Sequence, residues 1–233
     1  MSNQQFSGFP EAGLQFLADL ANNNERPWFE ENKSIYKQEL LQPAVAFVEA
    51  LGERLREIAP KVRYDTRTNG SGSLLRIYRD TRFSKDKTPY KTNISGMFWE
   101  GAGKKMAHPG FGFQLEPSGL GLVAGQFGFS KEQMQQYRDG VLHDVLGVEL
   151  ETAVSTLQQS GKYEIMGKEY KRVPRGYDPE HLRADLLRHK SLYIHPLNKI
   201  SSDKVLSSQL VDICMAYFEE MLPIQQWLVK IDQ

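Results

Sequence analysis

The 233-residue sequence has one cysteine, no excess charge of either sign and no long apolar run. The single cysteine, Cys214, excludes a disulfide framework within the chain and a zinc site built from cysteines. Lysine plus arginine and aspartate plus glutamate each number 29, which excludes a uniformly cationic protein of the histone kind. No segment approaches the roughly 18 apolar residues of a membrane-spanning helix, so we expect no membrane partner.

Targeting and cofactor signals are also missing. Residues 1–10 contain no basic residue and no apolar core, unlike a secretory signal. One thiol without such a signal is typical of a reducing compartment, and we expect a cytoplasmic protein. The five histidines are scattered without metal-ligand spacing, and the phosphate-loop, zinc-protease and nucleophile-elbow motifs are absent. The sequence therefore predicts neither a metal site nor a cofactor.

The apolar periodicity that is present indicates one α+β domain spanning residues 1–233. Residues 10–60 show helical spacing, residues 61–129 are sheet-rich, and residues 130–233 are mixed and mainly helical. Extended segments are expected at 74–79, 94–99, 111–115 and 120–127, with connections short enough for a mainly antiparallel sheet. We expect helices from the amino- and carboxy-terminal regions to flank this sheet. A further helix is predicted after Asp178, and Pro223 is expected to kink or split the last helix.

Charge is segregated along the chain although it is balanced overall. Residues 61–91 carry nine basic and three acidic side chains, a net charge of +6 in 31 residues, whereas the first sixty residues carry five basic and nine acidic ones. Alternation from Leu75 and Ile77 places Arg79 on the side of its strand that faces the core. A buried guanidinium requires a carboxylate, carbonyl groups or a bound anion.

The loop that follows this strand is the candidate binding site. Arginine forks match phosphate or carboxylate in pairs of hydrogen bonds, lysines add point charge, and aromatic rings stack on a base or ring. We therefore predict a basic pocket for an anionic, phosphorylated small ligand. The candidate anion-binding residues are Arg76, Arg79, Arg82, Lys85, Lys87, Lys91, Tyr78 and Tyr90.

Alternatives remain open at this point. The same patch is compatible with a nucleic-acid-binding module, whose affinity falls steeply with salt. It is also compatible with a protein-interaction domain in which Asp80 and Asp86 neutralise the cations in a purely structural web of ion pairs. The sequence does not identify a reaction; Asp80, Asp86 and His195 are the acid or base candidates if one occurs. A second basic cluster extends the first if the fold joins them: Lys168, Lys171, Arg172 and Arg175.

The segment R-I-Y-R-D-T-R-F-S-K-D-K-T-P-Y-K, residues 76–91, resembles the signature of a widespread, mostly bacterial family of single-domain proteins of unknown function. The signature has the form R-x-Y-R-D-x-R-F-x-K-D-K-x-P-Y-K. Other matching pieces are Phe16-Leu17, Asn22–Asn24, Trp28-Phe29 and Pro174–Tyr177. The resemblance covers roughly Phe9 to Leu222, and it implies a single domain but no known activity, cofactor or catalytic residue.

Overall fold

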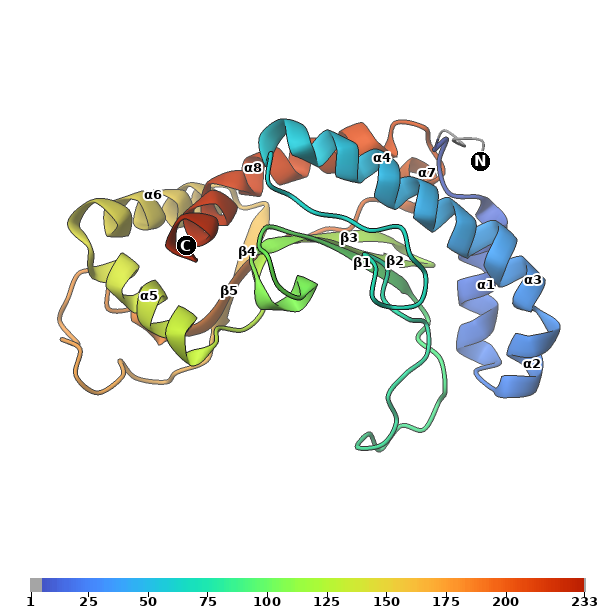
Figure 1. The fold of residues 1–233 in the computed structure, drawn as a ribbon, viewed down its shortest axis with the longest axis horizontal. Helices are drawn as coiled ribbons and strands as arrows, with labels where there is room; N and C mark the ends of the chain where they lie inside the picture. Colours follow the sequence, from blue (N-terminus) through green and yellow to red (C-terminus); the bar gives the residue numbers. More distant parts are fainter. Residues whose placement is uncertain (1–5, 233) are drawn as a thin grey trace.

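In the computed structural model, which describes residues 6–232, the amino-terminal region is a succession of helices (Figure 1). Pro27 and Pro43 stand in the first turns of two of them, where a backbone N–H has no helical partner to lose. Leu17 and Leu20 are fully buried on the inner face of the first helix. The elements are α1 (Glu11–Asn22), α2 (Arg26–Glu31), α3 (Lys33–Ile35), a π-helical turn (Tyr36–Leu41) and α4 (Gln42–Ile58).

Within the described residues, five antiparallel strands form one sheet in the order β1-β2-β3-β5-β4. A tight turn joins β2 to β3, with Glu116 paired to Gly119. The backbone of Gly119 has a φ of +134°, a conformation that glycine adopts without strain. The strands are β1 (Ile94–Trp99), β2 (Gly110–Glu116), β3 (Gly119–Gln126), β4 (Tyr163–Lys168) and β5 (His189–Pro196).

The carboxy-terminal helices complete the fold. Ser130 opens α5 with a capping box, in which its hydroxyl accepts from the Gln133 amide at 3.2 Å and the Gln133 side chain accepts in return at 3.0 Å. In Figure 1, α4 and α8 lie along the same face of the sheet, and α5 and α6 lie near the end of α8. These helices are α5 (Lys131–Leu142), α6 (Asp144–Ser160), α7 (Ser202–Val205) and α8 (Leu210–Ile231).

This arrangement confirms the predicted α+β class, with a mainly antiparallel sheet and helices from both ends of the chain. Alternation along the strands gives the sheet two different faces. Phe111, Phe113 and Leu115 of β2 are buried in the core beneath the helices. The residues between them, Gly112 and Gln114, face the side of the sheet that α4 and α8 leave uncovered.

Three local predictions were wrong. Residues 74–79 form only isolated bridges, at Leu74 and Tyr78, because the chain leaves the edge of β1 after Leu75 donates its N–H to Ser95 at 2.9 Å. The segment after Asp178 is a series of turns rather than a helix. Its Asp178 carboxylate accepts the N–H of Glu180 at 2.9 Å, so a side chain satisfies the backbone in place of a helical bond.

The third concerns the alternative that Pro223 splits the last helix: α8 continues through Pro223, and whether it is kinked there stays a prediction. The carbonyl that loses its partner to Pro223 belongs to the exposed residue Glu219, where water is available as a substitute. Cys214 is buried in the same helix, and burial raises the pKa of its thiol. Among residues 6–232, we find no helix that is long and apolar enough to cross a membrane.

Candidate functional site

Residues 76–91, which we call the arm, project from the sheet edge beside β1 (Figure 1, teal-green). Two backbone hydrogen bonds close its base, which we call the neck. The N–H of Arg79 donates to the carbonyl of Pro89 at 2.9 Å, and the N–H of Lys91 donates to the carbonyl of Ile77 at 2.7 Å. Beyond the neck the arm has bends and no regular secondary structure. The arm is therefore a long excursion between two antiparallel segments.

Aromatic side chains hold the neck against the amino-terminal helices. Tyr90 is 3% exposed and stacks on Phe29, with ring centroids 4.0 Å apart and planes 15° apart. Tyr78 lies 5.3 Å from the ring of Tyr90 and remains 52% exposed. Of the two tyrosines predicted to stack on a ligand, Tyr90 is buried and serves packing instead. Tyr78 keeps a free surface.

The two arginines nearest the end of the arm are paired with carboxylates of the arm itself. A guanidinium nitrogen of Arg79 donates to Asp86 and to the Thr88 hydroxyl, the latter at 2.5 Å. Arg82 makes a two-pronged contact with Asp80, at 2.9 and 2.7 Å. The prediction that Arg79 points into the core was wrong, because its side chain is 30% exposed and forms an ion pair with the exposed carboxylate of Asp86. These two ion pairs fit the structural alternative.

The same contacts make Asp80 and Asp86 poor acid or base candidates. Hydrogen bonds from Arg82 lower the pKa of Asp80 to about 2. Hydrogen bonds from the backbone and hydroxyl of Thr88, followed by one from Arg79, lower the pKa of Asp86 to about 2. Both carboxylates are therefore ionised at neutral pH and committed to partners within the arm.

The remaining cations of the arm have no carboxylate partner among the described residues. Lys85 is exposed, and Lys87 donates to the carbonyl of Thr81 at 2.9 Å. Arg76 donates its Nε to the carbonyl of Asn69 at 2.8 Å. Lys91 is half-buried, and desolvation by the surrounding protein lowers its pKa. These four side chains are the cations of the arm that no carboxylate neutralises among the described residues.

Lys105 lies with Arg76 and Lys91 at the root of the arm. Its ammonium donates to the carbonyl of Gly70 at 3.1 Å and to that of Gly72, in the same turn that holds Arg76. Burial lowers the pKa of Lys105, and the positive charge of Lys91 lowers it further. We call Arg76, Lys91 and Lys105 the rim cluster. The sequence analysis missed Lys105; its only sequence signal is a Lys104-Lys105 pair within a glycine-containing loop.

A hollow of about 480 Å³, which we call the trough, lies on the uncovered face of the sheet. Its lining includes Leu75, which precedes Arg76 in the chain, and Met106, which follows Lys105. The glycines Gly112 and Gly121 form part of the floor, on the central strands β2 and β3. Two of the three rim-cluster residues, Arg76 and Lys105, therefore adjoin lining residues of the trough in the chain.

His195 lines the opposite end of the trough, but both of its ring nitrogens are engaged. Nε2 lies 3.3 Å from a carboxylate oxygen of Glu164, and Nδ1 lies 3.1 Å from the carbonyl oxygen of Pro196. Lys199, also at this end, is paired with Glu116 and donates to Ser118 at 3.2 Å. At this end of the trough, both ring nitrogens of His195 and the ammonium of Lys199 therefore already have partners within the protein.

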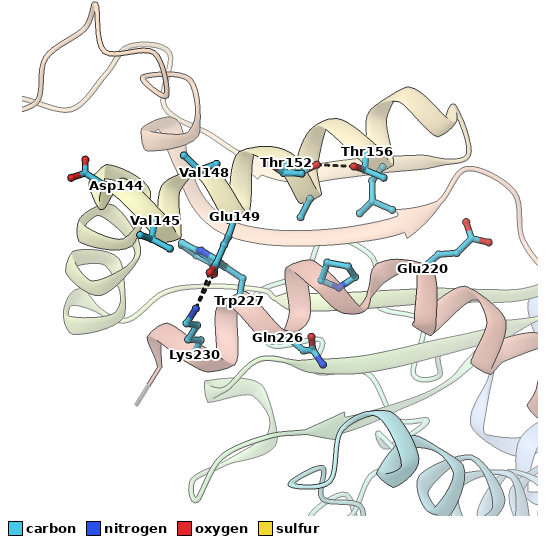
Figure 2. Close-up of a pocket in the computed structure, with 13 residues that line it drawn as sticks. Asp144, Val145, Val148, Glu149, Thr152, Thr156, Glu220, Gln226, Trp227 and Lys230 are labelled. Atoms are coloured by element: carbon cyan, nitrogen blue, oxygen red, sulfur yellow. Dashed lines mark hydrogen bonds and ion pairs between the residues drawn. The ribbon is translucent and has the colours of Figure 1, made fainter.

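A second hollow, of about 830 Å³, lies between α6 and α8 (Figure 2). Val145 and Val148 are exposed along one side, and Trp227 lies on the other. Among the described residues that line this hollow, Lys230 is the only cation, and it is paired with Glu149 at 2.9 Å. The other charged lining residues are acidic, namely Asp144 and Glu220. This groove does not suit an anion.

Among the described residues, no hydrogen bond or ion pair joins the second basic cluster of the sequence to the rim cluster. Lys168 pairs with Asp185 at 2.6 Å, at the end of β4. Within residues 6–232, no group of three or more histidine, cysteine, aspartate or glutamate side chains is placed to hold a metal ion.

The fold and the site together define an α+β protein whose antiparallel sheet leaves one face open, with a trough on that face. A family model described as a conserved hypothetical protein, DUF2461, matches residues 12–227. The chain belongs to this family. No match to the chain was found among curated proteins.

Proposed function

We propose that this protein binds a small anionic, phosphorylated ligand and that the rim cluster holds its charged group. Lys91 carries the proposal: it is a half-buried ammonium whose pKa desolvation lowers and for which no carboxylate partner is found among the described residues. A desolvated charge without a partner is costly, and such groups cluster at functional sites.

Lys105 strengthens the argument, because two desolvated lysines close enough to interact repel each other. Asp65 is the acidic residue whose charge reaches Lys105, but Asp65 is itself paired with Arg67. An oxyanion between the two ammonium groups relieves both desolvation and repulsion. Arg76 uses only Nε in its contact with Asn69, and its side chain is otherwise exposed, so its terminal nitrogens are available to the same anion.

The rest of the arm is assigned a supporting role. It carries six basic and two acidic residues, a net positive charge on a projecting segment. Such a charge attracts anions from a distance and raises the rate of encounter. In this scheme Arg79 and Arg82 shape the arm through their ion pairs, Lys85 and Lys87 attract the ligand, and Tyr78 offers its exposed ring to it.

The test is calorimetric titration of the purified protein with inorganic phosphate and ribose 5-phosphate at constant ionic strength. We expect Lys91→Met and Lys105→Met each to weaken binding by about tenfold or more, since a charge-assisted hydrogen bond contributes about 1.5–3 kcal/mol. Lys104→Met is the matched control, because Lys104 adjoins Lys105 and is exposed. Equal affinity in all four proteins, or no binding of either anion, contradicts the proposal.

The two alternatives give different results. A nucleic-acid-binding module loses affinity for oligonucleotides steeply between about 50 and 200 mM salt, and its affinity depends on Lys85 and Lys87 rather than on Lys105. A purely structural arm predicts that Arg79→Ser and Arg82→Ser lower stability while phosphate affinity stays unchanged in every variant of the rim cluster.

A further inference from the structure

The trough is much larger than a phosphate group alone would fill. Its volume of about 480 Å³ falls in the range of small-molecule sites, which extends over roughly 300–1,000 Å³. Several apolar side chains along it remain accessible because none of the described residues covers them: Met106 is 50% and Leu197 55% exposed, and Phe127 is also exposed. An apolar surface of this kind, next to a group of cations, indicates a ligand with two chemically different parts.

Gly121 shows that the floor of the trough is open. A Cβ atom added at Gly121 meets only the carbonyl oxygen of Gln114, at 3.8 Å, and its backbone is not in the left-handed region. The fold therefore does not require glycine at this position. Gly112 differs, because a Cβ there meets Met97 at 2.8 Å and Val123 at 2.9 Å. A side chain at Gly121 projects from β3 into the trough, so its absence leaves space above the sheet.

Resting on the proposed anion site, we propose that the ligand is an amphipathic phosphate monoester whose unbranched apolar body lies along the trough while the rim cluster holds its phosphate. The opposite end of the trough supports this orientation. There, Lys199 is paired with Glu116 and His195 with Glu164, so a second anionic group has no unpaired cation to meet. Arg76 and Lys105, which have no carboxylate partner among the described residues, adjoin the lining residues Leu75 and Met106 in the chain, and a ligand with one charged end is therefore oriented toward them.

We take the ligand to be a single dissolved molecule rather than the surface of a lipid bilayer. The arm projects from the sheet edge beside β1 (Figure 1), and the glycines of the floor lie on β2 and β3. An extended membrane surface meets projecting segments first, whereas one slender molecule can enter between them.

The experiment is a calorimetric series with methyl, butyl and octyl phosphate, each below its micellar concentration. We expect affinity to rise with chain length by up to about fourfold per buried methylene. Gly121→Leu fills the floor and is expected to remove the gain from methyl to octyl phosphate while leaving the affinity for inorganic phosphate within about twofold. The matched control is Gly128→Leu, because a Cβ at Gly128 has no neighbour within 4 Å and Gly128 does not line the trough.

A second variant keeps the test valid if Gly121→Leu does not fold. Met106→Glu places a negative charge on an exposed wall residue and is expected to weaken octyl phosphate at least tenfold more than inorganic phosphate.

The outcomes separate the two proposals. Equal affinities along the chain-length series, together with the loss of phosphate binding in Lys105→Met, refute the amphipathic ligand and leave the anion site standing. Octanol binding as tightly as octyl phosphate, with no effect of Lys105→Met, refutes the anion site. Binding to vesicles of phosphatidic acid without binding of dissolved octyl phosphate overturns the assignment to a single molecule.

Discussion

Asn24 illustrates how one side chain fixes the neck of the arm. Its amide nitrogen donates to the carbonyl of Tyr90 at 2.9 Å, and its amide oxygen accepts the N–H of the same residue at 3.0 Å. The carboxamide thus imitates a neighbouring strand, in a partly buried place where the backbone of Tyr90 has few other partners. Because Tyr90 adjoins Lys91, this contact also sets the position of the rim cluster.

We expect Asn24→Ala to lower the free energy of unfolding by about 2 kcal/mol, because two backbone groups lose their partners. For a chain of this length the melting temperature falls by about 4–8 °C. Urea unfolding followed by circular dichroism measures the loss. Asn22→Ala is the control, since Asn22 makes one exposed bond to its own helix at 3.2 Å and its loss should cost less than about 0.5 kcal/mol. Equal stabilities of the two variants disprove this role of Asn24.

Among the elements, the arm owes its shape to local ion pairs rather than to a hydrophobic core. Phe83, near its end, is 94% exposed, and the guanidinium of Arg82 lies 5.8 Å from its ring. Asp86 accepts the N–H and the hydroxyl of Thr88, at 2.9 and 2.8 Å, and also binds Arg79. A segment held in this way depends on the ionisation of its carboxyl groups.

The pH dependence of the arm follows from the lowered pKa values of Asp80 and Asp86. A carboxyl whose pKa is lower in the folded chain than the usual 3.9 stabilises the folded state above about pH 4, and this contribution is lost as the pH falls toward 2. We expect both side-chain carboxyl resonances to titrate near pH 2 in the folded protein and near pH 4 in urea. Midpoints near 4 in both conditions would show that the ion pairs do not form in solution.

How far the sequence predicts these elements depends on where each one finds its partners. The extended segments predicted at 94–99 and 111–115 are confirmed, and the second alternates clearly because Phe111, Phe113 and Leu115 pack in the core. The segment at 74–79 has the same alternation but leaves the sheet after Leu75, and no local pattern shows that departure. The charge excess of the arm is visible in the sequence, whereas its pairing depends on the folded positions of Asp80 and Asp86.

Lys105 shows the corresponding limit for the site. It lies fourteen positions after Lys91 in the sequence. Only the folded loop brings its ammonium to the turn at Gly70–Gly72. The trough is likewise a product of tertiary structure, because its glycines and apolar residues come from four strands and four connecting segments. Each strand alone reads as an ordinary half-buried strand, and the open face appears only when the sheet and its covering helices are placed together.

On the scale of the whole molecule, the end of α8 anchors the loop that bears Lys105 and Met106. The Asp232 carboxylate lies 2.7 Å from Nδ1 of His108 and accepts from the amide nitrogen of Gln133 at 2.6 Å. The N–H of Gly103 donates to Nε2 of His108 at 3.0 Å, so that Nδ1 carries the proton directed at Asp232. The loop of the rim cluster is therefore tied through His108 to a helix that also covers the opposite face of the sheet (Figure 1).

We expect Asp232→Ala to free this loop, because His108 and Gln133 then keep partly buried donors without an acceptor. The amide of Gly103 should exchange with solvent at least tenfold faster, as hydrogen exchange followed by mass spectrometry or NMR can measure. The affinity for inorganic phosphate should fall as well, since Lys105 is carried by the same loop. Lys230→Ala, which removes only the exposed pair with Glu149, is the control and should change neither quantity. If exchange at Gly103 quickens while phosphate affinity stays constant, the anchoring is real but Lys105 does not hold the anion; if neither changes, the loop is fixed by its own contacts to Gly70 and Gly72.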